Sequence, residues 1–112
     1  MKIIDSRYKL MRVYLSGGET LGGKPVYKMI VEKCLEMGIS GTTVFRGIYG
    51  YGDSKEIRSS RTLSLSADLP VVVEVVDLED NLKKVLPEIV KISPDALITL
   101  EAASVVYMSK SE

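Results

Sequence analysis

Two glycine-rich segments hold the residues of this sequence that are best suited to binding a phosphorylated ligand. The first, residues 18–25, reads G-x-x-x-x-G-K-P, one residue short of the phosphate-binding P-loop. A P-loop requires Ser or Thr after the lysine to ligate Mg²⁺, and Pro25 supplies neither a hydroxyl nor a backbone N–H. Nucleotide hydrolysis is therefore disfavoured. Gly23 and Lys24 could still hold an anion at a helix start; the alternative is a flexible turn in which proline opens the helix.

The second segment, residues 46–61, combines glycines, bases and two tyrosines. Glycine lets a ligand approach the backbone closely, basic side chains bind phosphate oxygens, and aromatic rings stack on planar groups. The ligand class that these residue types favour is a nucleotide or another phosphorylated small molecule. The alternative is a mobile hairpin tip with solvated charges. The candidate ligand-binding residues here are Arg46, Gly47, Gly50, Gly52, Lys55, Arg58 and Arg61.

Other reactive residue types indicate structural roles rather than catalysis. Glu74 interrupts a run of valines, so its carboxylate needs a partner such as Arg12 or Arg46. Cys34 falls on an apolar helix stripe and is expected in the core. The chain has no histidine, which removes the commonest general base and metal ligand. The sequence therefore predicts a non-enzyme with no metal site.

Composition limits the class of protein further. The 112 residues include 15 basic and 15 acidic side chains, and this neutrality disfavours a nucleic-acid binder that works by charge. One cysteine allows neither an intrachain disulfide nor a zinc site. No apolar run approaches the ~18 residues of a membrane span, and residues 1–10 lack a signal-peptide pattern. We expect a single cytoplasmic domain over 1–112, with its core at about 8–107.

Hydrophobic periodicity predicts an α+β domain. We expect main strands at 8–15, 42–49, 71–76 and 96–107, a short strand at 61–65, and helices at 24–37 and 78–91. Gly38 should end the first helix, and Pro87 should end or kink the second. The order β-α-β-β-α-β is the ferredoxin-like arrangement, a four-stranded antiparallel sheet with both helices on one face. The residues expected to face inward are Val26, Ile30, Cys34, Met37, Val31, Leu35, Leu82, Val85, Leu86, Ile89 and Val90.

The strand at 71–76 reads VVVEVV and is apolar on both faces. Val71, Val73 and Val75 would face the helices, which leaves Val72 and Val76 on the open side. Because so short a chain has little material to cover that side, we expect a homo-oligomer packed through the open sheet face. The alternative is cover by the chain's own loops.

The segments 38–52 and 68–77, with the run 23–27, resemble a family of small uncharacterised bacterial and archaeal proteins. That family lies within the PII-like (nitrogen-regulatory-protein-like) superfamily, and the resemblance spans about residues 10–106. It implies a ferredoxin-like fold, commonly trimeric, with small effectors bound at subunit clefts. It also implies that the loop after the second strand, residues 47–60, contacts partner proteins. Some relatives are encoded beside, or fused to, a fluoride-channel protein, which implies a regulatory role.

The resemblance to true PII proteins extends to only a few individual positions. Gly50 and Gly52 match glycines that lie near bound nucleotide there, and Gly38, Thr43 and Val44 match the strand pattern. The glycine-rich phosphate loop of PII proteins is replaced here by residues 93–95, and the basic C-terminal cluster by Lys110 alone. Three hypotheses follow: a regulatory sensor of a nucleotide or similar effector, a channel-associated partner without a small ligand, and an enzyme using the loop 18–24.

Overall fold

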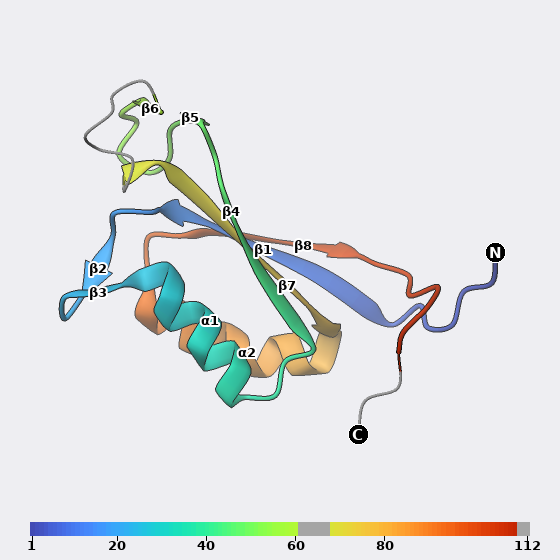
Figure 1. The fold of residues 1–112 in the computed structure, drawn as a ribbon. Helices are drawn as coiled ribbons and strands as arrows, with labels where there is room; N and C mark the ends of the chain where they lie inside the picture. The colour runs from blue at the N-terminus through green and yellow to red at the C-terminus, as the bar shows by residue number, and fades with distance from the viewer. Residues whose placement is uncertain (61–67, 110–112) are drawn as a thin grey trace.

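The computed structural model describes residues 1–60 and 68–109. Two helices lie against one face of a four-stranded antiparallel sheet, and the other face is open (Figure 1). The predicted ferredoxin-like fold is therefore confirmed. The expected short strand at 61–65 lies outside the described residues. The elements are β1 (Tyr8–Ser16), β2 (Thr20–Leu21), β3 (Lys24–Pro25), α1 (Val26–Glu36), β4 (Gly41–Arg46), β5 (Tyr49–Gly50), β6 (Arg58–Ser59), β7 (Pro70–Leu78), α2 (Glu79–Ile92) and β8 (Leu97–Ala102).

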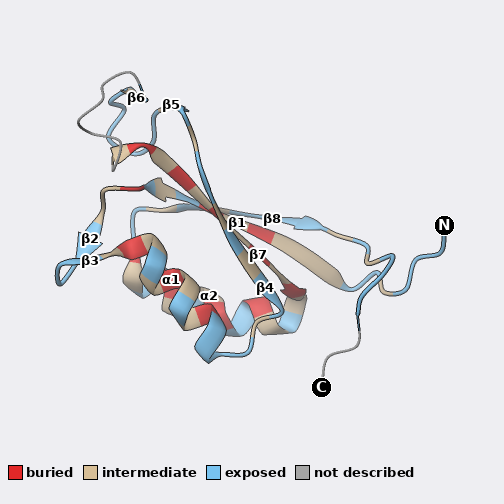
Figure 2. Cartoon of the chain, viewed as in Figure 1, coloured by how far each residue is buried: buried red, intermediate tan, exposed pale blue. Residues whose placement is uncertain are grey.

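The sheet has the strand order β4-β7-β1-β8, with every neighbouring pair antiparallel. The central strand β7 pairs along its length with β1 and over six residues with β4. It alternates strictly in burial, because its side chains point to opposite faces in turn and the helices cover only one face. Its helix-facing side chains Val71, Val73 and Val75 are buried (Figure 2). Val72 and Val76 lie on the open face and are half-buried, as expected for a strand apolar on both sides.

One hydrophobic core lies between the helices and the sheet. Val26, Ile30 and Cys34 of α1 are buried there, as the periodicity predicts. Leu35, Met37 and Val90, which were expected inside, are exposed, because each lies to the side of its helix's buried stripe. The other core residues are Met11, Val13, Val73, Val75, Leu82, Val85 and Ile89.

Gly38 follows the end of α1 with a φ of +74°, which confirms the predicted glycine cap. By contrast, α2 does not end at Pro87 but continues to Ile92. The lost backbone hydrogen bond is compensated by the burial of Val85 and Ile89 on either side of the proline. No helix within the described ranges is long and apolar enough to cross a bilayer.

Several predicted boundaries are wrong. The strand expected at 42–49 ends at Arg46, because Pro70, the next partner in the β4–β7 register, has no N–H: Gly47 donates to its carbonyl at 2.7 Å but receives no bond in return. The strand expected at 96–107 ends at Ala102, and Val105 instead pairs with Asp5. The two expected loops each contain a small hairpin, β2–β3 and β5–β6.

Candidate ligand-binding site

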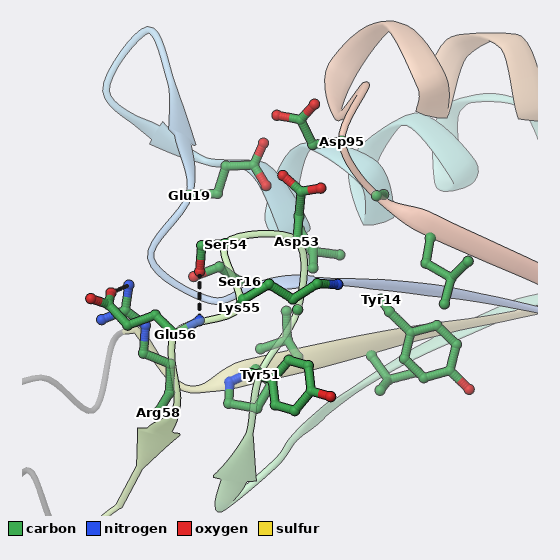
Figure 3. Close-up of a pocket in the computed structure, with 17 residues that line it drawn as sticks. Tyr14, Ser16, Glu19, Tyr51, Asp53, Ser54, Lys55, Glu56, Arg58 and Asp95 are labelled. Carbon is green, nitrogen blue, oxygen red and sulfur yellow. Dashed lines mark hydrogen bonds and ion pairs between the residues drawn. The ribbon is translucent and has the colours of Figure 1, made fainter.

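A cavity of about 800 Å³ lies at the edge of the sheet where β1 ends and β7 and β8 begin. Residues 51–56 and Arg58, at the start of β6, form its opposite wall (Figure 3). The antiparallel register places Leu15 beside Val71 and Tyr14 beside Leu97, so the ends of the three strands form a continuous surface. The position of the cavity therefore follows directly from the sheet topology.

The sheet side of the cavity is largely apolar. Pro70, Val71, Val72, Ala96 and Leu97 line it. Two tyrosines add aromatic rings, Tyr14 from β1 and Tyr51 from the segment after β5 (Figure 3). Such a surface suits a flat, apolar part of a ligand, because rings and branched aliphatic side chains together offer a large contact area.

Three carboxylates from separate elements gather on one side of the cavity. Glu19 follows β1, Asp53 lies in the 51–58 segment, and Asp95 precedes β8 (Figure 3). Burial raises the pKa of the Glu19 carboxyl, the hydrogen bond from Ser93 at 3.4 Å lowers it, and Asp95 raises it again, so the net shift of this pKa is upward. This side of the cavity is an acceptor-rich surface with uncompensated negative charge.

The basic side chains of the cavity are Lys55 and Arg58. Lys55, whose φ is +60°, extends from the loop in the direction of Tyr14, and its Nζ lies 5.8 Å from the centre of the Tyr51 ring (Figure 3). The Nη2 of Arg58 forms an ion pair with Glu56 at 2.7 Å. With four carboxylates against two cations, the lining carries a formal charge of −2. Among residues 1–60 and 68–109, no three His, Cys, Asp or Glu side chains are arranged so that they could hold a metal ion together, the three carboxylates of the cavity included.

The structure brings together three of the residues that the sequence singled out. Gly52, Lys55 and Arg58 all line the cavity. Gly47 and Gly50 instead lie behind it, against Pro70: a Cβ on Gly47 would lie 3.2 Å from Pro70 Cγ, and one on Gly50 3.6 Å away. These two glycines allow the loop to pack closely on the start of β7, so they shape the cavity wall without lining it.

The remaining candidates do not line the cavity. Arg46 ends β4 with its guanidinium 5.9 Å from the centre of the Tyr27 ring of α1. Lys24 forms an ion pair with Glu32, also on α1, and Gly23 occupies the β2–β3 turn with a φ of +82°. Arg61 lies outside the described residues.

Sequence reasoning missed Tyr14, Glu19, Asp53 and Asp95. Three of them come from strand ends or turns that are more than 25 residues from the glycine-rich segment 46–61, so no local motif joins them. The available signal was topological, because the ferredoxin-like order brings the end of the first strand and the starts of the third and fourth to one edge of the sheet.

The solved structures to which this chain is similar include PII-like proteins. The nitrogen regulatory PII-like protein CPII of Thiomonas intermedia K12, in a structure bound to ADP, AMP and bicarbonate, superimposes with a TM-score of 0.67 at 12% identity, over 88% of this chain and 87% of that one. Arabidopsis thaliana PII bound to citrate gives a TM-score of 0.57 at 18% identity, over 88% and 79%. The fold of this chain is therefore PII-like.

Sequence comparison gives the family. The family model DUF190, described as "Uncharacterized ACR, COG1993", matches residues 8–105. A UPF0166 protein of Aquifex aeolicus is 47% identical over 100 residues, covering 89% of this chain and 94% of the relative. A UPF0166 protein of Methanocaldococcus jannaschii is 38% identical over 84 residues, covering 75% and 77%. The chain belongs to the DUF190 family, which confirms the resemblance found in the sequence.

Proposed function

We propose that this protein is a cytoplasmic, non-enzymatic regulatory module that binds a phosphorylated small effector, with a nucleotide as the leading candidate. The observation that carries the proposal is the cavity of about 800 Å³ between the strand ends and residues 51–58, which has the size and mixed lining of a small-molecule site. The PII-like protein CPII, whose fold this chain shares, has been solved with ADP and AMP.

Different parts of the cavity lining suit the base, the ribose and the phosphates of a nucleotide. The apolar sheet surface with Tyr14 and Tyr51 would accept the base. The acceptor-rich side with Glu19 and Asp95 would receive hydrogen bonds from ribose hydroxyls or base N–H groups, because ionised carboxylates only accept. Lys55 would bind the phosphates.

The formal charge of −2 on the cavity implies that an anionic effector brings or meets additional positive charge. Since like charges repel strongly in a partly buried site, the phosphates would require a divalent cation or basic groups from a second copy. A cavity that lies between two copies can receive such basic groups from the second copy, whereas a cavity formed by a single copy cannot. The negative lining therefore favours a site between copies.

We further propose that the protein is a homo-oligomer, a trimer by resemblance to the PII-like superfamily, packed through the open sheet face. Phe45 and Leu97 on that face are 52% and 64% exposed, and Val72 and Val76 lie there on the central strand. Burying these side chains against another copy would release their apolar surface from water.

The loop 47–60 is the proposed output of the module. It carries four large exposed hydrophobic side chains, and its described regular pairing is the short β5–β6 hairpin. An effector in the cavity would contact residues 51–58 and so change what this loop presents to a partner protein. The exposed side chains are Ile48, Tyr49, Tyr51 and Ile57.

Thermal unfolding and calorimetry with AMP, ADP and ATP, each with and without Mg²⁺, test the proposal. A bound nucleotide should raise the melting temperature, with about 2.7 kcal/mol of stabilisation at a concentration of 100 Kd. Lys55→Ala should weaken binding at least tenfold, whereas Lys28→Ala, an exposed lysine on α1, should leave it unchanged. Absence of a shift with every nucleotide, or equal affinities for the two variants, would overturn the proposal.

A further inference from the structure

Residues 1–7 and 103–109 form a terminal arm that extends beyond the end of the sheet, away from the cavity (Figure 1). Its two segments run side by side, because the N–H of Val105 donates to the carbonyl of Asp5 at 2.8 Å and the N–H of Ile4 donates to that of Val105 at 2.6 Å. Arg7 adds an ion pair to Asp5 at 2.8 Å. The arm is therefore an ordered projection with its own backbone pairing.

The arm carries large apolar side chains without a core of its own. Tyr107 is 79% exposed, and the others are also exposed, so none packs into the protomer's interior. An apolar patch of this kind indicates a surface that another molecule covers. The exposed apolar residues of the arm are Met1, Ile3, Ile4, Val106, Tyr107 and Met108.

A second uncovered apolar patch, the open-face row, lies near the other end of β1. Phe45, Val72, Tyr14 and Leu97 are neighbours across four strands in the sheet register. Three of these residues also line the cavity, so the row borders it. The arm does not cover the row of its own chain, because it extends away from the sheet at Tyr8, which is six residues or about 20 Å from Tyr14 (Figure 1).

The chain exposes more surface than a compact monomer of its mass. Its accessible surface is 7588 Å², whereas a compact monomer of 12.3 kDa would expose about 6,100 Å². The difference of about 1,500 Å² is large enough for a standard interface, in which each partner buries roughly 800 Å².

We propose that the terminal arm of one copy docks on the open-face row of a second copy, beside its cavity. This inference rests on the proposed homo-oligomer and specifies its contact. The side chains of the arm carry a formal charge of +1, from Lys2, Asp5 and Arg7, which complements the −2 of the cavity lining. Arm and row are different surfaces, so the same contact, repeated around the axis of the trimer proposed above, closes into a ring. The cavity then lies at the seam between copies.

Charge substitutions on exposed positions test this contact in the full chain. The arm variant is Ile3→Lys with Ile4→Lys, and the face variant is Phe45→Lys, which leaves the cavity lining intact. The matched control is Leu35→Lys, at a position that is 78% exposed on α1, on the opposite side of the sheet. Tyr107→Lys tests the arm from its second segment, and circular dichroism verifies that each variant is folded.

Sedimentation velocity and native mass measurement give the readout. We expect a wild-type ring, a ring for Leu35→Lys, and monomers for the arm and face variants alone. Mixed in equal amounts, the arm and face variants should form a one-to-one heterodimer, because one intact arm then meets one intact row. If either arm variant forms a ring, or if the mixture stays monomeric, the proposed arm contact is wrong. The proposed homo-oligomer is not affected by these two outcomes as long as the wild type is a ring. A monomeric wild type would overturn both.

Discussion

The Nε of Arg12 lies 3.0 Å from the Oε2 of Glu74, in the middle of the open sheet face. The two residues are direct partners in the β1–β7 register, and the Nη1 of Arg12 also bonds to Glu101 of β8. The hydrogen bonds to Glu74 and Glu101 raise the pKa of the Arg12 guanidinium, and the bond to Glu74 has the larger effect. One arginine thus holds two carboxylates together on three neighbouring strands, which confirms the partner expected for Glu74.

Replacing Arg12 should therefore destabilise the protein through the charges it leaves behind. In Arg12→Gln, Glu74 and Glu101 remain near one another without the cation that separates them, so the melting temperature should fall. Adding Glu74→Gln should restore part of the loss, because it removes that repulsion. Calorimetric melting of the two single variants and the double variant measures this coupling. Additive changes in melting temperature would contradict it.

Asp77 joins the start of β4 to the start of α2. Its carboxylate is only 3% exposed and accepts hydrogen bonds from the N–H of Ser40 at 2.9 Å, the N–H of Leu78 at 2.6 Å and the Nδ2 of Asn81 at 2.8 Å. Asp77→Ala should lower the free energy of unfolding by about 1–2 kcal/mol, because three hydrogen bonds to a buried carboxylate are lost and their partly buried donors lose their acceptor. Chemical denaturation measures this; a loss below about 0.5 kcal/mol would contradict it.

The same carboxylate should give the stability a defined pH dependence. Burial raises the pKa of Asp77, but the hydrogen bonds from Asn81, Ser40 and Leu78 outweigh it, so the net pKa lies below the ordinary value. A lowered folded-state pKa stabilises the fold fully above about pH 5 and progressively less as the pH falls through it. The stability difference between wild type and Asp77→Asn should therefore shrink between pH 5 and pH 3 in denaturation series. A constant difference would show that another group is responsible.

The contact between Gly47 and Pro70 should be sensitive to a single methyl group. In Gly47→Ala the new Cβ would lie 3.2 Å from Pro70 Cγ, so one of the two segments must shift, at a cost of about 1 kcal/mol. Gly52→Ala is the matched control, because no atom lies within 4 Å of its added Cβ, and its stability should change by less than about 0.5 kcal/mol. Equal unfolding curves for both variants would exclude the predicted close packing.

Cys34 should be unreactive in the folded protein. It is buried in the core, and burial raises the pKa of its thiol to about 11. At pH 8 only about one thiol in a thousand would be ionised, and the thiolate is the nucleophile. Reaction with a disulfide reagent at pH 8 should therefore be slow, and become fast in denaturant. Fast labelling of the native protein would show that α1 opens readily.

The fold could be predicted from sequence because its signals are local. The run of β-branched residues around Val73 indicates a strand, and the spacing of Val26, Ile30 and Cys34 indicates a helix and its buried side. The β-α-β-β-α-β order then leaves few topologies, since crossovers are right-handed. The errors lie where the partner strand decides the outcome, as at Arg46, beyond which Pro70 of β7 has no N–H to continue the pairing.

The candidate site could be predicted only in part, for the same reason. Lys55 and Arg58 belong to a segment whose composition is unusual, so they stand out in the sequence. Glu19 and Asp95 belong to ordinary turns and reach the cavity only through the packing of β1 against β8. Lys24 matched a phosphate-binding pattern, yet its ammonium group pairs with Glu32 on the next element. The spacing of residues in the sequence does not show which of them line the cavity and which form ion pairs elsewhere in the protein.

The position of β7 has a consequence for how the protein could transmit a signal. This strand supplies Pro70, Val71 and Val72 to the cavity, lies between β1 and β4, and passes into α2 at Glu79 without an intervening loop. One wall of the cavity is thus part of the central strand of the sheet, which is the least deformable part of the molecule. Residues 51–58 form the other wall, which is joined to the rest of the protein through a short hairpin. A ligand bound between the two walls would displace only the outer wall. Its binding would therefore change the surface of the protein and leave the core unchanged.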